Sequence, residues 1–140
     1  MTDDAVPSLY DAVGGMPFFE RLVSTFYDEV EADVVLAPLY PEAPDFSGAR
    51  RRFTLFLAQY WGGPTTYNDE RGHPRLRMRH MPFTVGPLQR DHWLAHMNHA
   101  IAESDATAEI RQTLVDYFVP AAEHLRNDTG LPITSAAYPR

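Results

Sequence analysis

The chain has 140 residues, enough for one domain with a sizeable core, and 44% of them are hydrophobic, as in globular proteins. Its formal net charge of −7 argues against a general nucleic-acid-binding protein, and no apolar run approaches the roughly 20 residues of a membrane span. It has no cysteine, which excludes disulfides, thiolate metal sites and cysteine nucleophiles.

Helical periodicity recurs along the chain and strand patterning is weak, so we predict an all-α fold. Ser8 is expected to cap a short helix that runs through Ala12, and Gly14-Gly15 ends it. Pro17 suits the first turn of the next helix. One face of that helix carries its large apolar side chains: Phe19, Leu22, Val23, Phe26, Tyr27 and Val30.

The middle of the chain predicts one further helix between two irregular segments. A short piece around Val34–Leu39 ends at Tyr40-Pro41. Ser47 is expected to cap a helix that bears Ala49, Phe53, Phe56, Leu57 and Tyr60, before Gly62-Gly63-Pro64 ends it.

A long irregular stretch is predicted from about Thr65 to Arg75, and a helical turn over Leu76–His80. Loops this long inside a domain are usually functional.

Two more helices are predicted in the last third of the chain. The first covers roughly Leu88–Glu103, and the second begins near Thr107 or Ala108 and reaches about Arg126. Pro120 lies inside the second, so we expect a kink or break there. The domain would then span residues 9–126, between a flexible segment 1–8 and a flexible tail 127–140.

The segment from Arg71 to Phe83 places two histidines among arginines in an otherwise acidic chain. Neutral imidazole is a common ligand of transition metals and of haem iron, and guanidinium groups bind carboxylates such as the haem propionates. His80 is the first candidate for a metal ligand and His73 the competing one. The alternative is a solvated basic loop whose histidines bind nothing.

Three aromatic residues carry polar atoms that suit a binding site. Tyr27 lies on the apolar face of its helix, Tyr40 precedes a proline, and Trp93 lies on the expected buried face of its helix. Each either packs in the core or points its donor into a cavity.

A second histidine group, His92, His96 and His99, shares one helix face. The spacing of His92 and His96 is compatible with zinc. Asp91, Asn98 and Glu103 surround these histidines, so a solvated polar face is the simpler interpretation.

Several segments together resemble the truncated haemoglobins. Leu9–Gly15, Phe26-Tyr27 and Leu39–Glu42 resemble that family as a whole. Phe56–Tyr67, Arg71–His80 and Arg90–Leu94 are similar to its second group, the O-type found in actinobacteria. The resemblance spans about Leu9 to Arg126.

This resemblance implies a two-over-two helical sandwich around haem b, with a long loop before the proximal histidine. His80 would be the iron ligand, and Tyr27, Tyr40 and Trp93 would be the donors of the distal pocket. Ala49 falls where ordinary globins place a distal histidine. Phe53 replaces a leucine that is usual in relatives, and so narrows the pocket. The remaining haem contacts would come from Phe56, Leu76, Arg77, Met78 and Arg79.

The expected ligands are dioxygen, nitric oxide and carbon monoxide. Two hydrogen-bond donors would slow the release of dioxygen, which favours scavenging, redox chemistry or nitric-oxide detoxification over oxygen delivery. Nitric-oxide dioxygenase or weak peroxidase activity would need an external reductase, because the chain has no flavin or nicotinamide motif. Ala49 supplies no acid–base group for a dedicated peroxidase.

The alternative function is a small helical interaction module that binds no haem and docks an acidic partner through the arginine-rich loop. We expect a cytoplasmic protein, because the acidic N-terminus resembles no secretory signal. The oligomeric state is left open, with a homodimer among the alternatives.

Overall fold

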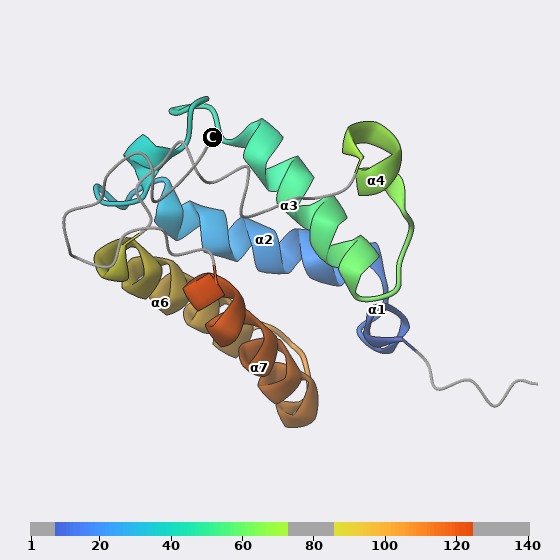
Figure 1. Ribbon diagram of the computed structural model, residues 1–140. Coiled ribbons are helices and arrows are strands. Elements are labelled where there is room, and N and C mark those ends of the chain that lie inside the picture. The colour runs from blue at the N-terminus through green and yellow to red at the C-terminus, as the bar shows by residue number, and fades with distance from the viewer. Residues whose placement is uncertain (1–7, 73–85, 125–140) are drawn as a thin grey trace, which may run out of the picture.

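The structure, a computed structural model, describes residues 8–72 and 86–124, and these form helices and no strand. This confirms the all-α prediction. The elements, in chain order, are α1 (Leu9–Ala12), α2 (Met16–Val30), the 3-10 helix η1 (Ala37–Leu39), α3 (Ser47–Tyr60), α4 (Thr66–Arg71), α6 (Pro87–Glu103) and α7 (Ala108–His124) (Figure 1).

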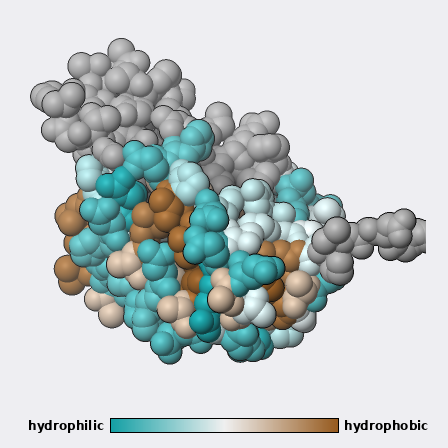
Figure 2. Space-filling view, turned by 90° about the horizontal axis from the view of Figure 1, so that it is seen from below, coloured by the Kyte–Doolittle hydropathy of each residue, from teal (hydrophilic) through white to brown (hydrophobic). Residues whose placement is uncertain are grey.

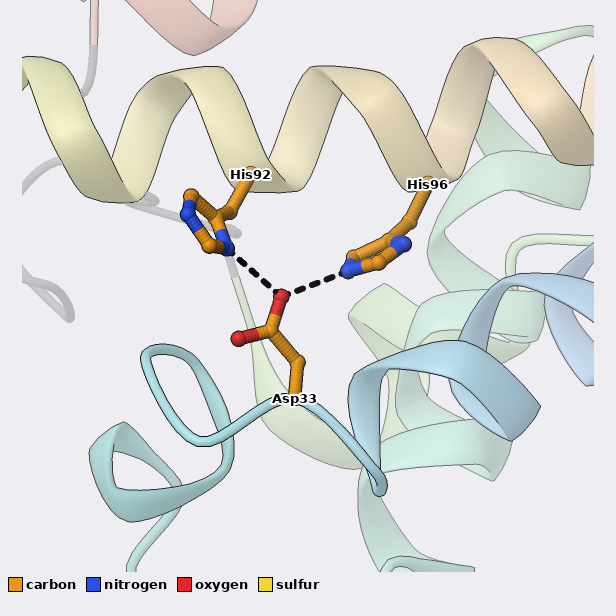
Figure 3. A group of neighbouring side chains, drawn as sticks. All are labelled: Asp33, His92 and His96. Atoms are coloured by element: carbon orange, nitrogen blue, oxygen red, sulfur yellow. Dashed lines mark hydrogen bonds and ion pairs between the residues drawn. The ribbon is translucent and has the colours of Figure 1, made fainter.

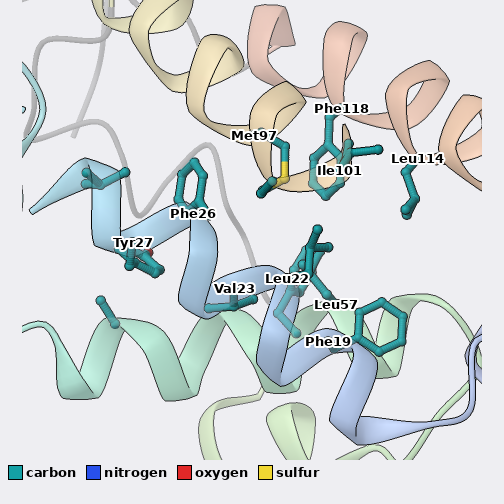
Figure 4. Close-up of a cluster of buried hydrophobic side chains, with 14 of the residues drawn as sticks. Phe19, Leu22, Val23, Phe26, Tyr27, Leu57, Met97, Ile101, Leu114 and Phe118 are labelled. Carbon is teal, nitrogen blue, oxygen red and sulfur yellow. The ribbon is translucent and has the colours of Figure 1, made fainter. Parts of the chain in front are cut away.

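The four long helices form two packed pairs. Helix α2 packs against α3 on one side and against α6 on the other, and α7 packs against α6 (Figure 1). The whole apolar face predicted for α2 is buried. Figure 4 shows that Phe26 points from α2 toward α6, whereas Tyr27 points toward α3. Large apolar side chains that are almost fully buried contribute roughly 1.5–3 kcal/mol each, and they hold the pairs together.

The first turn of the chain forms as the sequence predicts. The backbone N–H of Asp11 donates to Ser8 Oγ at 3.1 Å. The backbone N–H of Tyr10 donates to the carbonyl of Trp61 at 3.0 Å, so α1 lies against the end of α3. Gly62 allows this approach, since it has φ +103° and a Cβ there would lie 2.5 Å from the Cβ of Ser8.

The expected irregular stretch is wrong in its first part, because Thr66–Arg71 form α4. Tyr67 buries its ring against Phe56, with centroids 5.7 Å apart. The side chain of Gln59 accepts from the backbone N–H of Asn68 and donates to its side-chain oxygen, each at 3.0 Å. These contacts with α3 stabilise a helix too short to form alone.

The cap predicted for α3 is wrong, and of the kink or break expected at Pro120 the break does not occur. Ser47 is the first residue of α3 and does not cap it; Asp45 instead accepts from the Ser47 backbone N–H at 3.0 Å and from its hydroxyl at 2.7 Å. Pro120 does not break α7, which continues to His124. Pro120 and Asp116 are both exposed, so the carbonyl that loses its partner can bind water.

One face of the molecule is mostly polar. The face seen from below in Figure 1 shows separate brown areas within a largely hydrophilic surface (Figure 2). Within the described ranges, none of the helices combines the length and the apolar character that crossing a bilayer requires.

Candidate functional site

The three predicted distal residues converge on one aromatic cluster. Tyr27 comes from α2, Tyr40 follows η1, and Trp93 comes from α6. Phe53 of α3 joins them, because its ring centroid lies 6.2 Å from both Tyr27 and Trp93. The rings of Tyr27 and Tyr40 meet edge to face at 5.6 Å. Residues that are far apart in the sequence therefore surround one site.

Three phenylalanines complete this cluster, and sequence reasoning did not assign them to the site. Phe26 lies 5.1 Å from Trp93, Phe46 lies 5.1 Å from Tyr40, and Phe118 lies 5.7 Å from Trp93, measured between ring centroids. Helical periodicity identified Phe26 only as a core residue. Nothing in the local sequence indicates that Phe46 or Phe118 reaches the site.

The hydroxyls of Tyr27 and Tyr40 form a hydrogen-bonded pair among these apolar rings. Burial raises the pKa of Tyr27 well above its ordinary value, and the nearby Tyr40 raises it further. Burial also raises the pKa of Tyr40, although its hydrogen bond with Tyr27 acts in the opposite direction. Both phenols are therefore protonated near neutral pH and can donate hydrogen bonds.

Arg50 of α3 packs against the ring of Tyr27. Its guanidinium carbon lies 5.8 Å from the centre of the Tyr27 ring. Arg50 Nε donates to Glu31 at 3.1 Å, and Nη2 donates to Asp28 at 3.0 Å. The contacts connect α3 with the end of α2.

The three consecutive arginines Arg50-Arg51-Arg52 are neutralised by carboxylates. Arg51 forms two hydrogen bonds with Glu70, at 2.6 and 2.7 Å, and Arg52 donates to Glu42 at 3.0 Å. This run is therefore a set of ion pairs and not a free cationic surface.

Two further predicted contacts, Ala49 and Phe56, are buried on α3 with 8% of their surface exposed. The role of Ala49 at the haem stays a prediction. Phe56 lies farther along α3 and contacts Tyr60 and Tyr67, not the two distal tyrosines.

The other predicted ligands lie outside the described residues. These are the proposed iron ligand His80, its competitor His73, and the neighbours Arg75, Leu76, Arg77, Met78 and Arg79. The structure therefore describes the distal side of the predicted site and does not test the proximal side.

A separate hollow of about 670 Å³ lies between the C-terminal parts of α3 and α7. Tyr60, Trp61 and Tyr117 line it, together with Asp116, Pro120, Ala121 and His124. None of the predicted distal donors lines the hollow, so it is distinct from the aromatic cluster.

The second histidine group meets acidic residues from the end of α2. Desolvation lowers the pKa of His96, but hydrogen bonds with Asp33 and Glu29 outweigh it, and the net shift is upward. Burial raises the pKa of Asp33, but hydrogen bonds with His96, His92 and two backbone N–H groups lower it far more. The expected solvated face is thus only partly correct, because the rings of His92 and His96 are partly exposed but contact Asp33.

The model of the bacterial-like globin family matches residues 8–127 of this chain. The chain belongs to the bacterial-like globin family. A group 2 truncated haemoglobin of Bacillus subtilis is 38% identical over 120 residues, which cover 86% of this globin and 89% of the relative.

Solved structures show the same fold. A thermostable haemoglobin of the actinobacterium Thermobifida fusca is 49% identical, with a TM-score of 0.84, over 87% of this globin and 98% of that chain. A truncated oxygen-avid haemoglobin of Bacillus subtilis is 36% identical, with a TM-score of 0.80, over 86% and 100%. The resemblance to group II truncated haemoglobins is thus confirmed, and this globin is a haem protein that binds a diatomic gas.

The described residues fit a haem with a polar gaseous ligand. Tyr27 is only 5% exposed, yet its hydroxyl lies among phenylalanines with one tyrosine as its polar partner. In a hydrogen-bonded pair of phenols one O–H remains available as a donor, so this lining fits a haem whose ligand accepts a hydrogen bond.

Proposed function

We propose that this globin binds dioxygen on haem b and retains it for redox chemistry or nitric-oxide detoxification, rather than delivering it. Haem b, held by His80, would supply the ferrous iron at which diatomic gases bind. The observation that carries the proposal is the pair of contacting phenols at the distal cluster, with Tyr27 buried and Tyr40 partly buried.

Tyr40 is the direct donor in this proposal and Tyr27 positions it. The polar partner of the deeply buried Tyr27 hydroxyl is Tyr40. When the Tyr27 hydroxyl donates to Tyr40 Oη, the Tyr40 hydroxyl proton remains available for a hydrogen bond to a gas bound at the haem. The Trp93 indole N–H is a second donor, because its ring lies against the same phenylalanines.

The surrounding rings strengthen these hydrogen bonds by excluding water. Phe26, Phe46 and Phe53 pack against the ring of Tyr27, and Phe46 also packs against Tyr40. A hydrogen bond to a charged acceptor contributes about 1.5–3 kcal/mol, which corresponds to roughly one to two decades in dissociation rate. Slow release of dioxygen leaves time for the bound gas to react with a second molecule such as nitric oxide. Repeated turnover then requires an external reductase. The oxygen-avid relative supports this reading by analogy.

The haem assignment is tested by the absorption spectrum of the purified protein after haem is supplied. We expect a Soret band in the wild type and in the control His73→Ala, and a lost or strongly altered band in His80→Ala. A colourless wild type would overturn the proposal and favour the interaction module with an arginine-rich docking loop.

The donor assignment is tested by the rate of dioxygen dissociation, followed by stopped flow. We expect Tyr40→Phe to release dioxygen about 10- to 100-fold faster, and Trp93→Phe to add a smaller increase. Tyr60→Phe is the matched control, because Tyr60 is exposed and lies toward the far end of α3. Unchanged rates in both distal variants would refute the proposed donors.

A further inference from the structure

A carboxylate and two imidazoles meet at the junction of α2 and α6 (Figure 3). Asp33 lies just after α2, and its Oδ2 is 2.9 Å from His92 Nδ1 and 2.6 Å from His96 Nε2. One ligand atom from each of the three residues lies within 4.8 Å of the other two. None of these three residues belongs to the aromatic cluster around Tyr27 and Trp93.

We propose that Asp33, His92 and His96 form a binding site for a divalent transition metal ion of the zinc class. Two imidazole nitrogens and one carboxylate oxygen are a common set of protein ligands for zinc, with water completing the coordination. The helical spacing of His92 and His96 places both rings on one face of α6, as Figure 3 shows.

The ligand atom of His96 is fixed by a second carboxylate. His96 Nδ1 lies 2.8 Å from Glu29 Oε1, and Nε2 faces Asp33. When Nδ1 donates to Glu29, a neutral ring presents the lone pair of Nε2 toward Asp33. A carboxylate behind a ligating histidine is the usual arrangement that orients the ring and increases its basicity. Glu29 is therefore the positioning residue of the site.

The ligand atom of Asp33 is fixed by the backbone. Its Oδ1 accepts from the N–H of Val35 at 2.8 Å and from the N–H of Leu36 at 3.3 Å. These hydrogen bonds hold the carboxylate with Oδ2 directed at the two histidines. Only 7% of the Asp33 side chain is exposed, so the carboxylate has little freedom to turn to solvent.

The site is open enough for an ion to enter. The His92 side chain is 36% exposed and the His96 side chain 20%. Zinc ligands around one ion lie roughly 3.3 Å apart, given bonds of about 2.0–2.2 Å. The distances from Asp33 Oδ2 to the two imidazole nitrogens are shorter, 2.9 and 2.6 Å. Zinc binding would therefore require each ring to move away from Oδ2 by less than about 1 Å, and the partly exposed His92 ring has room to do so.

An ion here would connect the segment that leads to Tyr40 with the helix that carries Trp93. His92 immediately precedes Trp93, and Asp33 belongs to the turn before η1. Metal binding would thus stabilise the packing of α2 on α6. The inference does not depend on the proposed gas chemistry, because zinc content is measured independently of ligand kinetics.

The test is equilibrium dialysis of the haem-loaded protein against Zn²⁺ at neutral pH, with metal analysis. We expect one bound zinc per chain in the wild type, and an affinity reduced at least about 10-fold by Asp33→Asn and by His92→Gln. His99→Gln is the matched control: His99 lies on the same helix, 3.3 Å from Glu29 Oε2, but is not a ligand. Its zinc affinity should match the wild type.

Two results would overturn the proposal. The first is a wild type that binds no more zinc than His92→Gln, which would leave the cluster as ion pairs around a protonated His96. The second is a loss in His99→Gln as large as in the ligand variants, which would indicate diffuse binding to surface histidines. The Soret band and helical circular dichroism of each variant report folding. If Asp33→Asn fails to fold, the more exposed His92→Gln carries the test.

Discussion

Replacement of Phe53 by leucine should destabilise this globin and widen the distal pocket, the space expected between Tyr27, Tyr40, Phe53 and Trp93. The Phe53 ring contacts the rings of Phe26 at 5.6 Å, Tyr27 and Trp93 at 6.2 Å, and Phe118 at 6.5 Å. Aromatic pairs at such distances contribute about 0.5–1.5 kcal/mol each beyond burial. Leucine retains part of the apolar contact, so we expect a net loss of about 1–3 kcal/mol, which lowers Tm by roughly 3–10 °C.

Two assays separate the consequences of this substitution. Denaturant unfolding of the haem-loaded protein measures stability, and flash photolysis measures the association rate of carbon monoxide, which should rise because leucine is smaller. Phe18→Leu is the control: Phe18 is 2% exposed and contacts Phe19, outside the distal cluster. It should lower stability and leave association unchanged. An unchanged association rate in Phe53→Leu would refute the assignment of this ring to the distal pocket.

Three further predictions concern the folding stability of the protein. Gly62→Ala should cost about 2–3 kcal/mol of stability, because the new Cβ would lie 2.5 Å from the Cβ of Ser8, the α1 cap. Gly72→Ala should cost only about 1 kcal/mol of backbone strain, because the space around Gly72 is open. Equal losses in denaturant unfolding would contradict the clash at Gly62. Burial raises the pKa of Tyr117 to about 12, so the unfolded chain loses this proton near pH 10 while the folded chain keeps it. The free energy of unfolding should therefore fall as pH rises from about 10 to 12. The fall should be smaller in Tyr117→Phe. Arg50→Met should lower stability by about 1–2 kcal/mol and Arg51→Met by less, because Arg50 is less exposed and contacts two carboxylates. The reverse order in denaturant unfolding would contradict this prediction.

Local chemistry determined much of the fold from the sequence alone. Ser8 caps α1, Pro17 lies in the first turn of α2, and the apolar face predicted for α2 is the buried one. Such features depend on side chains within a few positions of each other, so their pattern in the sequence is sufficient. The resemblance to truncated haemoglobins predicted three distal donors, and the structure brings Tyr27, Tyr40 and Trp93 into one aromatic cluster.

Packing decided what the sequence did not show. Residues 66–71 form a helix because Tyr67 docks on Phe56, and α7 continues through Pro120 on an exposed side of the helix. Asp33 meets His92 and His96 across about sixty positions, as their sequence separations of 59 and 63 show. Helical spacing predicts that two histidines share a face, but which carboxylate they meet depends on how α2 lies on α6. That arrangement is set by burial of the whole core, and no local pattern encodes it.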